Sequence, residues 1–349
     1  MRNSEYISKL YRPPLEEPKG KEYLFLDKNE PPFSAFESLG DLFNDEDILN
    51  LREYPNIYNL YIQLSKFTKV DIDNLLITQG SEQVLKYIFE VFVQEGDEVV
   101  YYNPSFAMYD VYSYQKKAKV KQLEFNEDGT MNLDDILKTV TLKTRLFSLI
   151  NPHNFTGTYL DLKELKIIAE HTRKTNTIFL IDEAYYHYIS VSAVELIEEY
   201  NHILVSRTFS KALGIPGARV GYAISSKKNI ELLRKFKPIN EIDYLSGVIA
   251  SKTLEKAEDI LAKNVNQVKK WQSIFKEASL KELKYIETNA NYILFKSSSY
   301  EYHKELLESN KIVTRLNFNV ECLKDCIRFS VVDDKNMERV FNLLKGIYK

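Results

Sequence analysis

The sequence predicts an α/β protein, with a large domain built on a mostly parallel central sheet flanked by helices and a smaller α+β domain after it. Two observations predict this fold. Through the middle of the chain, short apolar runs alternate with amphipathic stretches, which is typical of parallel strands joined by crossover helices. Beyond Pro238 the pattern changes to a long polar helical stretch followed by shorter elements, which indicates a second unit.

The strands of the large domain are predicted from their apolar runs. They cover residues 74–78, 98–102, 146–150, 177–182, 203–206 and 220–224. After the first strand, apolar side chains from Val84 to Phe92 fall on one helical face, and Ser81 is placed to cap that helix. A second amphipathic helix includes Leu162 to Ala169.

The C-terminal part begins with a predicted connector helix over residues 254–278, whose many lysines and glutamates indicate a solvated face. Strands are predicted at 291–295, 312–314 and 326–332, and helices around 302–309 and 336–348. We therefore expect three parts. They are an N-terminal arm with part of the small domain (1–34), the large domain (35–240), and the connector with the small C-terminal domain (241–349).

The charge balance argues against a polyanionic partner. Lys and Arg number 47 against 50 Asp and Glu, so the net charge of −3 gives no general attraction to nucleic acid or to an anionic membrane. No run approaches the roughly 20 apolar residues of a membrane span, and the chain does not start like a secretory signal, so we expect a cytoplasmic protein. Cys322 and Cys326 lack the spacing of a metal site, and no metal is expected.

One group of motifs carries chemistry. Lys211 ends a Thr-x-Ser-Lys run, Asp182 lies upstream of it, and Arg219 lies eight residues downstream. A lysine amine condenses with an aldehyde to form a Schiff base, and a carboxylate beside a pyridine nitrogen keeps that nitrogen protonated. Lys211 and Asp182 therefore predict a site for pyridoxal 5'-phosphate.

The other residues of these motifs suit the rest of that cofactor. The hydroxyls of Thr208 and Ser210 can donate to its phosphate, and Arg219 has the planar fork that matches phosphate geometry. Tyr185, three residues after Asp182, can donate to the 3-oxygen of the ring. None of the five histidines is needed for this chemistry.

These motifs resemble those of the fold type I pyridoxal phosphate enzymes, the class I and II aminotransferases, and most closely the histidinol-phosphate aminotransferase subgroup. The resemblance extends from residues 26–30 to Arg328. It implies that Lys211 forms the Schiff base and that Asp182 is the partner of the pyridine nitrogen. It also implies Tyr185 as the donor to the 3-oxygen and Arg219 as the phosphate anchor, which are the roles that the chemistry alone suggests.

Further positions gain a role through the resemblance. Ser81 and Glu82 would bind the cofactor phosphate through their backbone, at a helix N-terminus whose free N–H groups attract anions. Phe106 would stack on the ring, and Asn154 would bond the 3-oxygen. The sequence departs from the family at Phe155, where proline is usual. Since a cis bond is costly before phenylalanine, the loop has either a trans bond with a shifted asparagine or a strained bond held by its surroundings.

Two arginines are expected to bind the substrate. By resemblance, Arg315 and Arg328 would hold its carboxylate or phosphate, although an arginine such as Arg328 in an apolar strand is also compatible with an internal ion pair or an outward face. Tyr54 matches a tyrosine that reaches the cofactor phosphate of the neighbouring subunit, which implies a homodimer with shared active sites. Tyr11 aligns loosely with a substrate contact in the N-terminal arm.

The expected function is the transfer of an amino group to or from a small phosphorylated amino/oxo substrate. Histidinol phosphate is the first candidate, with glutamate and 2-oxoglutarate as the common pair, and Lys211 would carry the proton. A decarboxylase of phosphothreonine or phosphoserine shares every cofactor contact and is the alternative, although Tyr185 slightly favours the aminotransferase. A non-catalytic binding protein on the same fold is a more remote alternative, because no catalytic group is missing.

Overall fold

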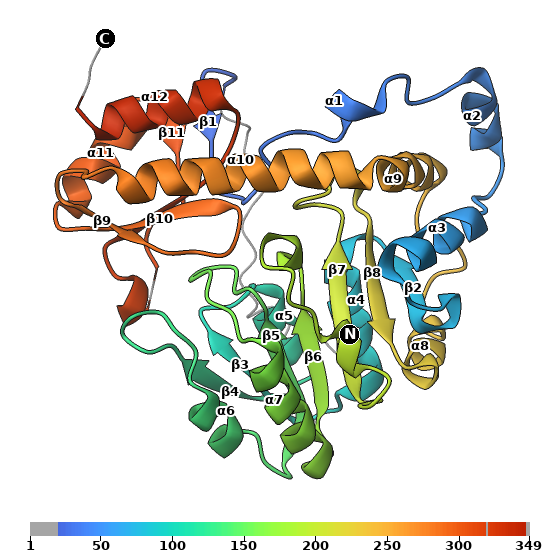
Figure 1. Cartoon of the computed structure of the whole chain (residues 1–349). Coiled ribbons are helices and arrows are strands. Elements are labelled where there is room, and N and C mark those ends of the chain that lie inside the picture. The colour runs from blue at the N-terminus through green and yellow to red at the C-terminus, as the bar shows by residue number, and fades with distance from the viewer. Residues whose placement is uncertain (1–19, 319, 347–349) are drawn as a thin grey trace, which may run out of the picture.

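The computed structural model describes residues 20–318 and 320–346 (Figure 1). At its centre lies a seven-stranded sheet with the order β2-β8-β7-β6-β5-β3-β4. The strands are β2 (Leu75–Thr78), β3 (Glu98–Asn103), β4 (Lys119–Glu124), β5 (Thr144–Ile150), β6 (Ile178–Asp182), β7 (Ile203–Thr208) and β8 (Gly221–Ser225). Neighbours run parallel except at β8, which is antiparallel to both β2 and β7. The predicted α/β fold with a mostly parallel sheet is confirmed.

Helices cover both faces of this sheet. One layer contains α4 (Gly80–Phe92), α5 (Met108–Gln115) and α8 (Lys227–Arg234), and the other contains α3 (Tyr58–Thr68), α6 (Leu133–Thr139), α7 (Leu162–Lys174) and α9 (Tyr244–Glu255). Leu75 and Ile77 pack toward the α3 layer and Leu76 toward the α4 layer, because successive strand residues point to opposite faces. A strand buried on both faces reads as a continuous apolar run, which is why these strands are visible in the sequence.

A second, antiparallel sheet with the order β12-β10-β9 lies beside the first. It consists of β9 (Leu283–Ile286), β10 (Tyr292–Ser297) and β12 (Cys326–Ser330), and it packs with α10 (Ala257–Glu277), α11 (Tyr300–Ser309) and α12 (Asp334–Leu344). The N-terminal β1 (Leu24–Phe25) pairs in parallel with β11 (Ile312–Val313). In Figure 1, α10 extends from α9 to this second sheet and so bridges the two parts of the molecule. The domain limits given by the sequence analysis remain a prediction.

Some elements differ from the sequence-based expectation. The edge strand β4 was not predicted, because five of its six residues are exposed and its composition is mostly polar. The short strand β9 was also not predicted. The helix expected over 254–278 is present as α10, and α9 before it was not predicted. Helix α4 begins at Gly80 with Gln79 before it, so Ser81 lies in the first turn and does not cap the helix.

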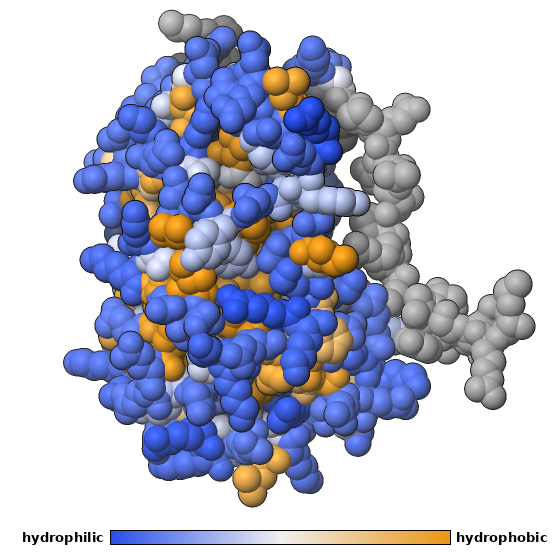
Figure 2. Space-filling model, turned by 90° about the vertical axis from the view of Figure 1, so that its right-hand side faces the viewer, coloured by the Kyte–Doolittle hydropathy of each residue, from blue (hydrophilic) through white to orange (hydrophobic). Residues whose placement is uncertain are grey.

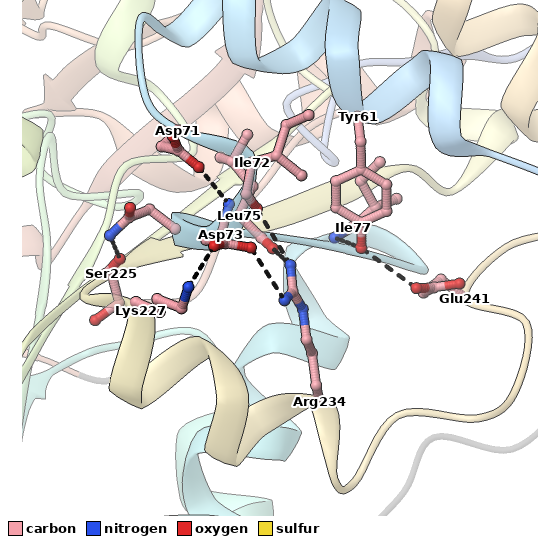
Figure 3. Close-up of polar contacts among 11 residues, drawn as sticks. Tyr61, Asp71, Ile72, Asp73, Leu75, Ile77, Ser225, Lys227, Arg234 and Glu241 are labelled. Atoms are coloured by element: carbon pink, nitrogen blue, oxygen red, sulfur yellow. Dashed lines mark hydrogen bonds and ion pairs between the residues drawn. The ribbon is translucent and has the colours of Figure 1, made fainter.

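The segment after α8 is tied back to the large sheet by polar contacts (Figure 3). The hydroxyl of Tyr61 on α3 accepts a hydrogen bond from the Ile77 backbone at 3.1 Å and donates one to Glu241 at 3.3 Å. Burial raises the pKa of Tyr61 well above its ordinary value. Arg234 at the end of α8 donates to the carbonyls of Ile72 and Leu75. These contacts connect α3, β2 and the start of the α9 segment.

Within residues 20–318 and 320–346, no helix has the length and apolar character needed to cross a membrane. Two short helices, α1 (Phe36–Leu39) and α2 (Asp45–Leu49), precede α3 at one side of the large sheet.

Candidate active site

A pocket of about 480 Å³ opens beside the large sheet and collects most of the predicted site residues. Those that line it are Ser81, Glu82, Phe106, Asn154, Asp182, Tyr185, Thr208, Ser210, Lys211, Arg219, Arg315 and Arg328. They come from the loops after several different strands and from the second sheet. The fold therefore brings together residues that are separated by up to about 250 positions in the chain.

The sheet topology explains this convergence. Asp182 is the last residue of β6 and Thr208 is the last residue of β7, so both lie at the carboxyl edge of parallel strands, where ligands bind in open α/β sheets. Arg219 instead precedes its strand. Because β8 runs antiparallel to β7, the start of β8 lies at that same edge, which places Arg219 with the others.

Asp182 is held by two donors and is almost fully buried, with 5% of its surface exposed. The hydroxyl of Ser206 donates to its carboxylate at 3.0 Å, and the backbone N–H of Ala184 donates at 3.3 Å. Burial nevertheless raises the pKa of Asp182 from 3.8 to about 6, since these hydrogen bonds only partly offset the loss of hydration. A positively charged partner beside Asp182 would therefore favour its ionised form.

Because of this raised pKa, ionised Asp182 lowers the free energy of unfolding of the cofactor-free protein above pH 6. Between about pH 4 and 6 the folded state holds more protons at this site than the unfolded state, so its contribution to stability falls as pH rises. We expect Asp182→Asn to gain about 3 kcal/mol of unfolding free energy relative to the parent between pH 4 and pH 7. Urea unfolding of both proteins at a series of pH values measures this difference. A difference that does not change with pH would contradict it.

Lys211 lines the same pocket as Asp182. Its Nζ donates to the carbonyls of Asn29 at 2.7 Å and Lys28 at 3.1 Å, and lies 5.5 Å from the ring centre of Tyr185. The Tyr185 hydroxyl accepts a hydrogen bond from the Asn29 side chain at 3.0 Å. The amine and the phenol thus share one polar neighbour.

Backbone and side-chain donors converge at the start of α4. Nη1 of Arg219 donates to the Ser210 hydroxyl at 3.4 Å, and the Thr208 hydroxyl donates to the same oxygen at 3.0 Å. Gly80 has a φ of +72°, and a Cβ there would lie 2.7 Å from Nη2 of Arg219. Glycine at this position therefore lets the guanidinium approach the helix N-terminus, and the arrangement forms a cradle for an anion.

The loop after β5 presents a polar group that has no partner. The side-chain oxygen of Asn154 is buried and makes no hydrogen bond with any described residue. The cis peptide bonds of the described chain are Asn103–Pro104 and Asn151–Pro152, so the bond between Asn154 and Phe155 is trans. The trans bond of the first possibility is present, and the shift of the asparagine stays a prediction.

Arg328 is a buried cation that forms no ion pair with a carboxylate of the described residues. It is 5% exposed, and no Asp or Glu among the described residues forms an ion pair with it. Its Nη1 and Nη2 donate to the carbonyls of Asn154 at 2.7 Å and Asp27 at 3.1 Å, while its Nε is buried without a partner. Neither the internal ion pair nor the outward face that the sequence left open is present. Burial lowers the pKa of Arg328, and an anion would relieve this cost.

Three aromatic rings surround the Arg328 guanidinium. Its carbon is 5.3 Å from the ring centre of Phe155, 5.1 Å from that of Tyr292 and 6.0 Å from that of Phe318. Arg315 pairs with Arg328 through two backbone hydrogen bonds and lines the same pocket with an exposed side chain. Two guanidinium groups therefore border one pocket, next to the lysine and the anion cradle.

Comparisons with known proteins identify the family. The sequence profile of the family described as "Aminotransferase class I and II" matches residues 21–344. The chain belongs to this aminotransferase family. The predicted enzyme class, a pyridoxal phosphate-dependent aminotransferase, is thereby confirmed.

Relatives and solved structures agree with this assignment. The chain is 31% identical over 330 residues to a histidinol-phosphate aminotransferase of Caldanaerobacter subterraneus, and the alignment covers 92% of each chain. It is 28% identical to a histidinol-phosphate aminotransferase of Methanocaldococcus jannaschii, and that alignment covers 94% of this chain and 90% of the relative. The fold matches a histidinol-phosphate aminotransferase of Sinorhizobium meliloti in complex with pyridoxal-5'-phosphate. The TM-score is 0.85 at 19% identity, over 99% of this chain and 97% of the other.

The pocket of this aminotransferase fits pyridoxal phosphate. Lys211 offers the amine, Asp182 offers a buried carboxylate for a protonated ring nitrogen, and the donors at the start of α4 suit a phosphate. The unpartnered oxygen of Asn154 marks a place where a ligand with polar ring substituents would complete the hydrogen bonding. Phe106, which is 36% exposed, lines the pocket and can offer a ring face for stacking.

Two predicted residues are not placed in this pocket. Tyr54 is 89% exposed and does not line the pocket of its own chain. Tyr11 lies outside the described residues, so its role remains a prediction. His153, which follows β5 by sequence, is buried, and burial lowers its pKa to about 3, so it stays neutral at physiological pH.

Sequence reasoning gave no role to the N-terminal segment of Asp27, Lys28 and Asn29, all of which line the pocket. Asn29 contacts both Lys211 and Tyr185. The only signal for this segment was that the family resemblance starts there, because an isolated polar run has no periodicity that would indicate burial. Phe155 was noted as a departure, but its contact with Arg328 depends on tertiary structure.

Proposed function

We propose that this aminotransferase transfers an amino group between glutamate and a small phosphorylated oxo compound, with histidinol phosphate as the first candidate for the amino product. The proposal rests mainly on Arg328, a buried guanidinium that has no ion pair within the described part of the chain and that lies beside Arg315 in the same pocket. Two forks at one site suit a phosphate, which has more acceptor oxygens than a carboxylate. The names of the two relatives described above support the same substrate class.

Each residue has a proposed task in this reaction. When bound, pyridoxal phosphate supplies a ring that withdraws electrons from the carbon bearing the amino group. Asp182 holds the positive charge at the ring nitrogen, and the cradle around Arg219 fixes the phosphate. The Lys211 amine would take the proton from the substrate carbon as a general base and deliver it to the cofactor as a general acid. Arg328 orients the substrate so that this carbon faces Lys211.

The test is the absorbance of the purified protein mixed in turn with glutamate, histidinol phosphate, phosphoserine and phosphothreonine. Conversion of the cofactor band by glutamate and by histidinol phosphate, reversed by 2-oxoglutarate, is expected. Release of carbon dioxide from phosphoserine or phosphothreonine, with no change on adding glutamate, would contradict the proposal and identify a decarboxylase.

We also propose that the protein acts as a homodimer in the cytoplasm. Figure 2 looks onto the side that carries α2, α3 and α8 and shows apolar residues gathered between polar ones. In residues 36–58 and 236–239, large apolar side chains are exposed, namely Phe36, Ile48, Leu49, Leu51, Tyr54, Tyr58, Phe236 and Ile239. A patch of this kind is typical of a protein interface. A second copy is its expected occupant, and Tyr54 would reach the partner's cofactor phosphate.

Replacing Tyr54 by phenylalanine tests this shared site. Loss of one hydrogen bond to a charged phosphate is expected to weaken cofactor binding about tenfold, while the sedimentation of the dimer stays the same. The matched control is Tyr58→Phe, because Tyr58 is 60% exposed on the same surface and has no assigned contact with the cofactor. The proposal is contradicted if a Tyr54→Phe protein binds the cofactor as tightly as the control.

A further inference from the structure

Asn29 occupies an unusual position in the pocket. It is 3% exposed, and its φ of +53° lies in the left-handed region, which asparagine adopts more readily than most residues other than glycine. Its carbonyl accepts hydrogen bonds from Nζ of Lys211 at 2.7 Å and from the Asn291 side chain at 2.9 Å. These two hydrogen bonds hold the backbone of Asn29 and so fix the position of its Cβ atom.

The Asn29 amide sets the direction of one hydrogen bond. Its Nδ2 donates to the hydroxyl oxygen of Tyr185 at 3.0 Å. An amide NH₂ can only donate, so the Tyr185 oxygen accepts at this contact and its own proton is not used there. The structure records no acceptor for that proton among the described residues, although Tyr185 is only 5% exposed. The Tyr185 hydroxyl, which lines the pocket, can therefore donate its proton to a bound ligand.

We propose that Asn29 is a positioning residue that makes the Tyr185 hydroxyl a hydrogen-bond donor toward the ring oxygen of the cofactor. The inference rests on the proposed function, in which Tyr185 faces that oxygen. By accepting from Asn29, the tyrosine oxygen becomes a better donor, since linked hydrogen bonds polarise one another. A hydrogen bond donated to the ring oxygen stabilises its negative charge, which lowers the pH at which the bound cofactor loses its proton.

A purely structural role is the competing explanation, in which Asn29 only allows the left-handed turn. Substitutions separate the two explanations. Asn29→Gly keeps the left-handed backbone and its carbonyl but removes the donor to Tyr185. Asn29→Asp keeps the size of the side chain but offers an acceptor, so the Tyr185 proton turns toward the carboxylate and away from the cofactor.

The measurement is the pH midpoint of the visible absorbance of the bound cofactor, made on the holoenzyme without substrate. For Asn29→Gly we expect the midpoint to rise by about half a pH unit, and for Asn29→Asp by about one unit or more, which is about tenfold in the proton affinity. The control is Asn176→Gly, because Asn176 is exposed and has a similar φ of +56° far from the pocket. Its midpoint should equal that of the parent.

A double-mutant cycle with Tyr185→Phe completes the test. The charge of the new aspartate raises the midpoint in both backgrounds, so only the part that acts through the hydroxyl disappears in the phenylalanine background. If Asn29→Gly leaves the midpoint unchanged, or shifts it equally with and without the Tyr185 hydroxyl, the inference is wrong. Because no substrate is present, a midpoint shift in a protein that transfers no amino group would contradict only the proposed function.

Discussion

Replacing Lys211 by alanine is expected to lower kcat for amino transfer by at least about 10⁴-fold, the largest effect of any single change in this chain. Lys211 is proposed both to bond the cofactor and to move the proton, so two contributions disappear together. Its amine is also placed by two backbone carbonyls, at 2.7 and 3.1 Å, which no shorter side chain can reach. Steady-state rates with glutamate and 2-oxoglutarate measure the loss.

Lys263→Ala is the control for this prediction. Lys263 forms a half-exposed ion pair with Glu37 and does not line the pocket, so its loss should cost little. The Lys211→Ala protein should also lack the cofactor band that the control retains. An alanine variant that keeps the band and turns over at the parental rate would show that another amine does this chemistry.

Replacing Arg328 by leucine is expected to reduce kcat/KM for a phosphorylated substrate by about 10²- to 10³-fold. A fully buried guanidinium that pairs with an anion contributes several kcal/mol to binding, because the anion is otherwise left in the pocket without a counter-charge. Arg328→Lys should recover only part of this loss, since lysine has the charge but lacks the planar fork. Arg315→Lys should cost less, because the Arg315 side chain is exposed.

A substrate analogue without the phosphate distinguishes recognition from structural damage. Its kcat/KM should be nearly the same in the parent and in Arg328→Leu, so the preference for the phosphorylated compound collapses in the variant. Equal losses with both substrates would mean that Arg328 supports the fold through the carbonyls of Asp27 and Asn154 and does not recognise the phosphate.

The fold class could be predicted from the sequence because the central strands are buried on both faces. Residues such as Leu75, Leu76 and Ile77 are all apolar, so the strand stands out as a run. The edge strand β4 could not be recognised, because an exposed strand with alternating lysines has the composition of a loop. Helix α9 was also missed, although the start of α10 was predicted to within three residues.

The site was predictable where chemistry restricts the residue type and the motif is local in sequence. Lys211, Asp182 and Arg219 belong to short motifs, and the sheet places them around one pocket. Asn29 was not predictable, because its role depends on contacts with residues more than 150 positions away. The contacts of Arg328 could not be predicted from the sequence either, since an arginine in an apolar strand can form an ion pair, lie on an exposed face or bind a ligand.

The most direct test of the proposed function follows nitrogen through a complete turnover. Glutamate labelled with heavy nitrogen is incubated with the enzyme and the oxo counterpart of histidinol phosphate, and the phosphorylated product is examined by mass spectrometry. The proposal predicts labelled histidinol phosphate and an equal amount of 2-oxoglutarate, both absent with Lys211→Ala. Unlabelled phosphorylated product, or release of carbon dioxide in place of 2-oxoglutarate, would contradict it.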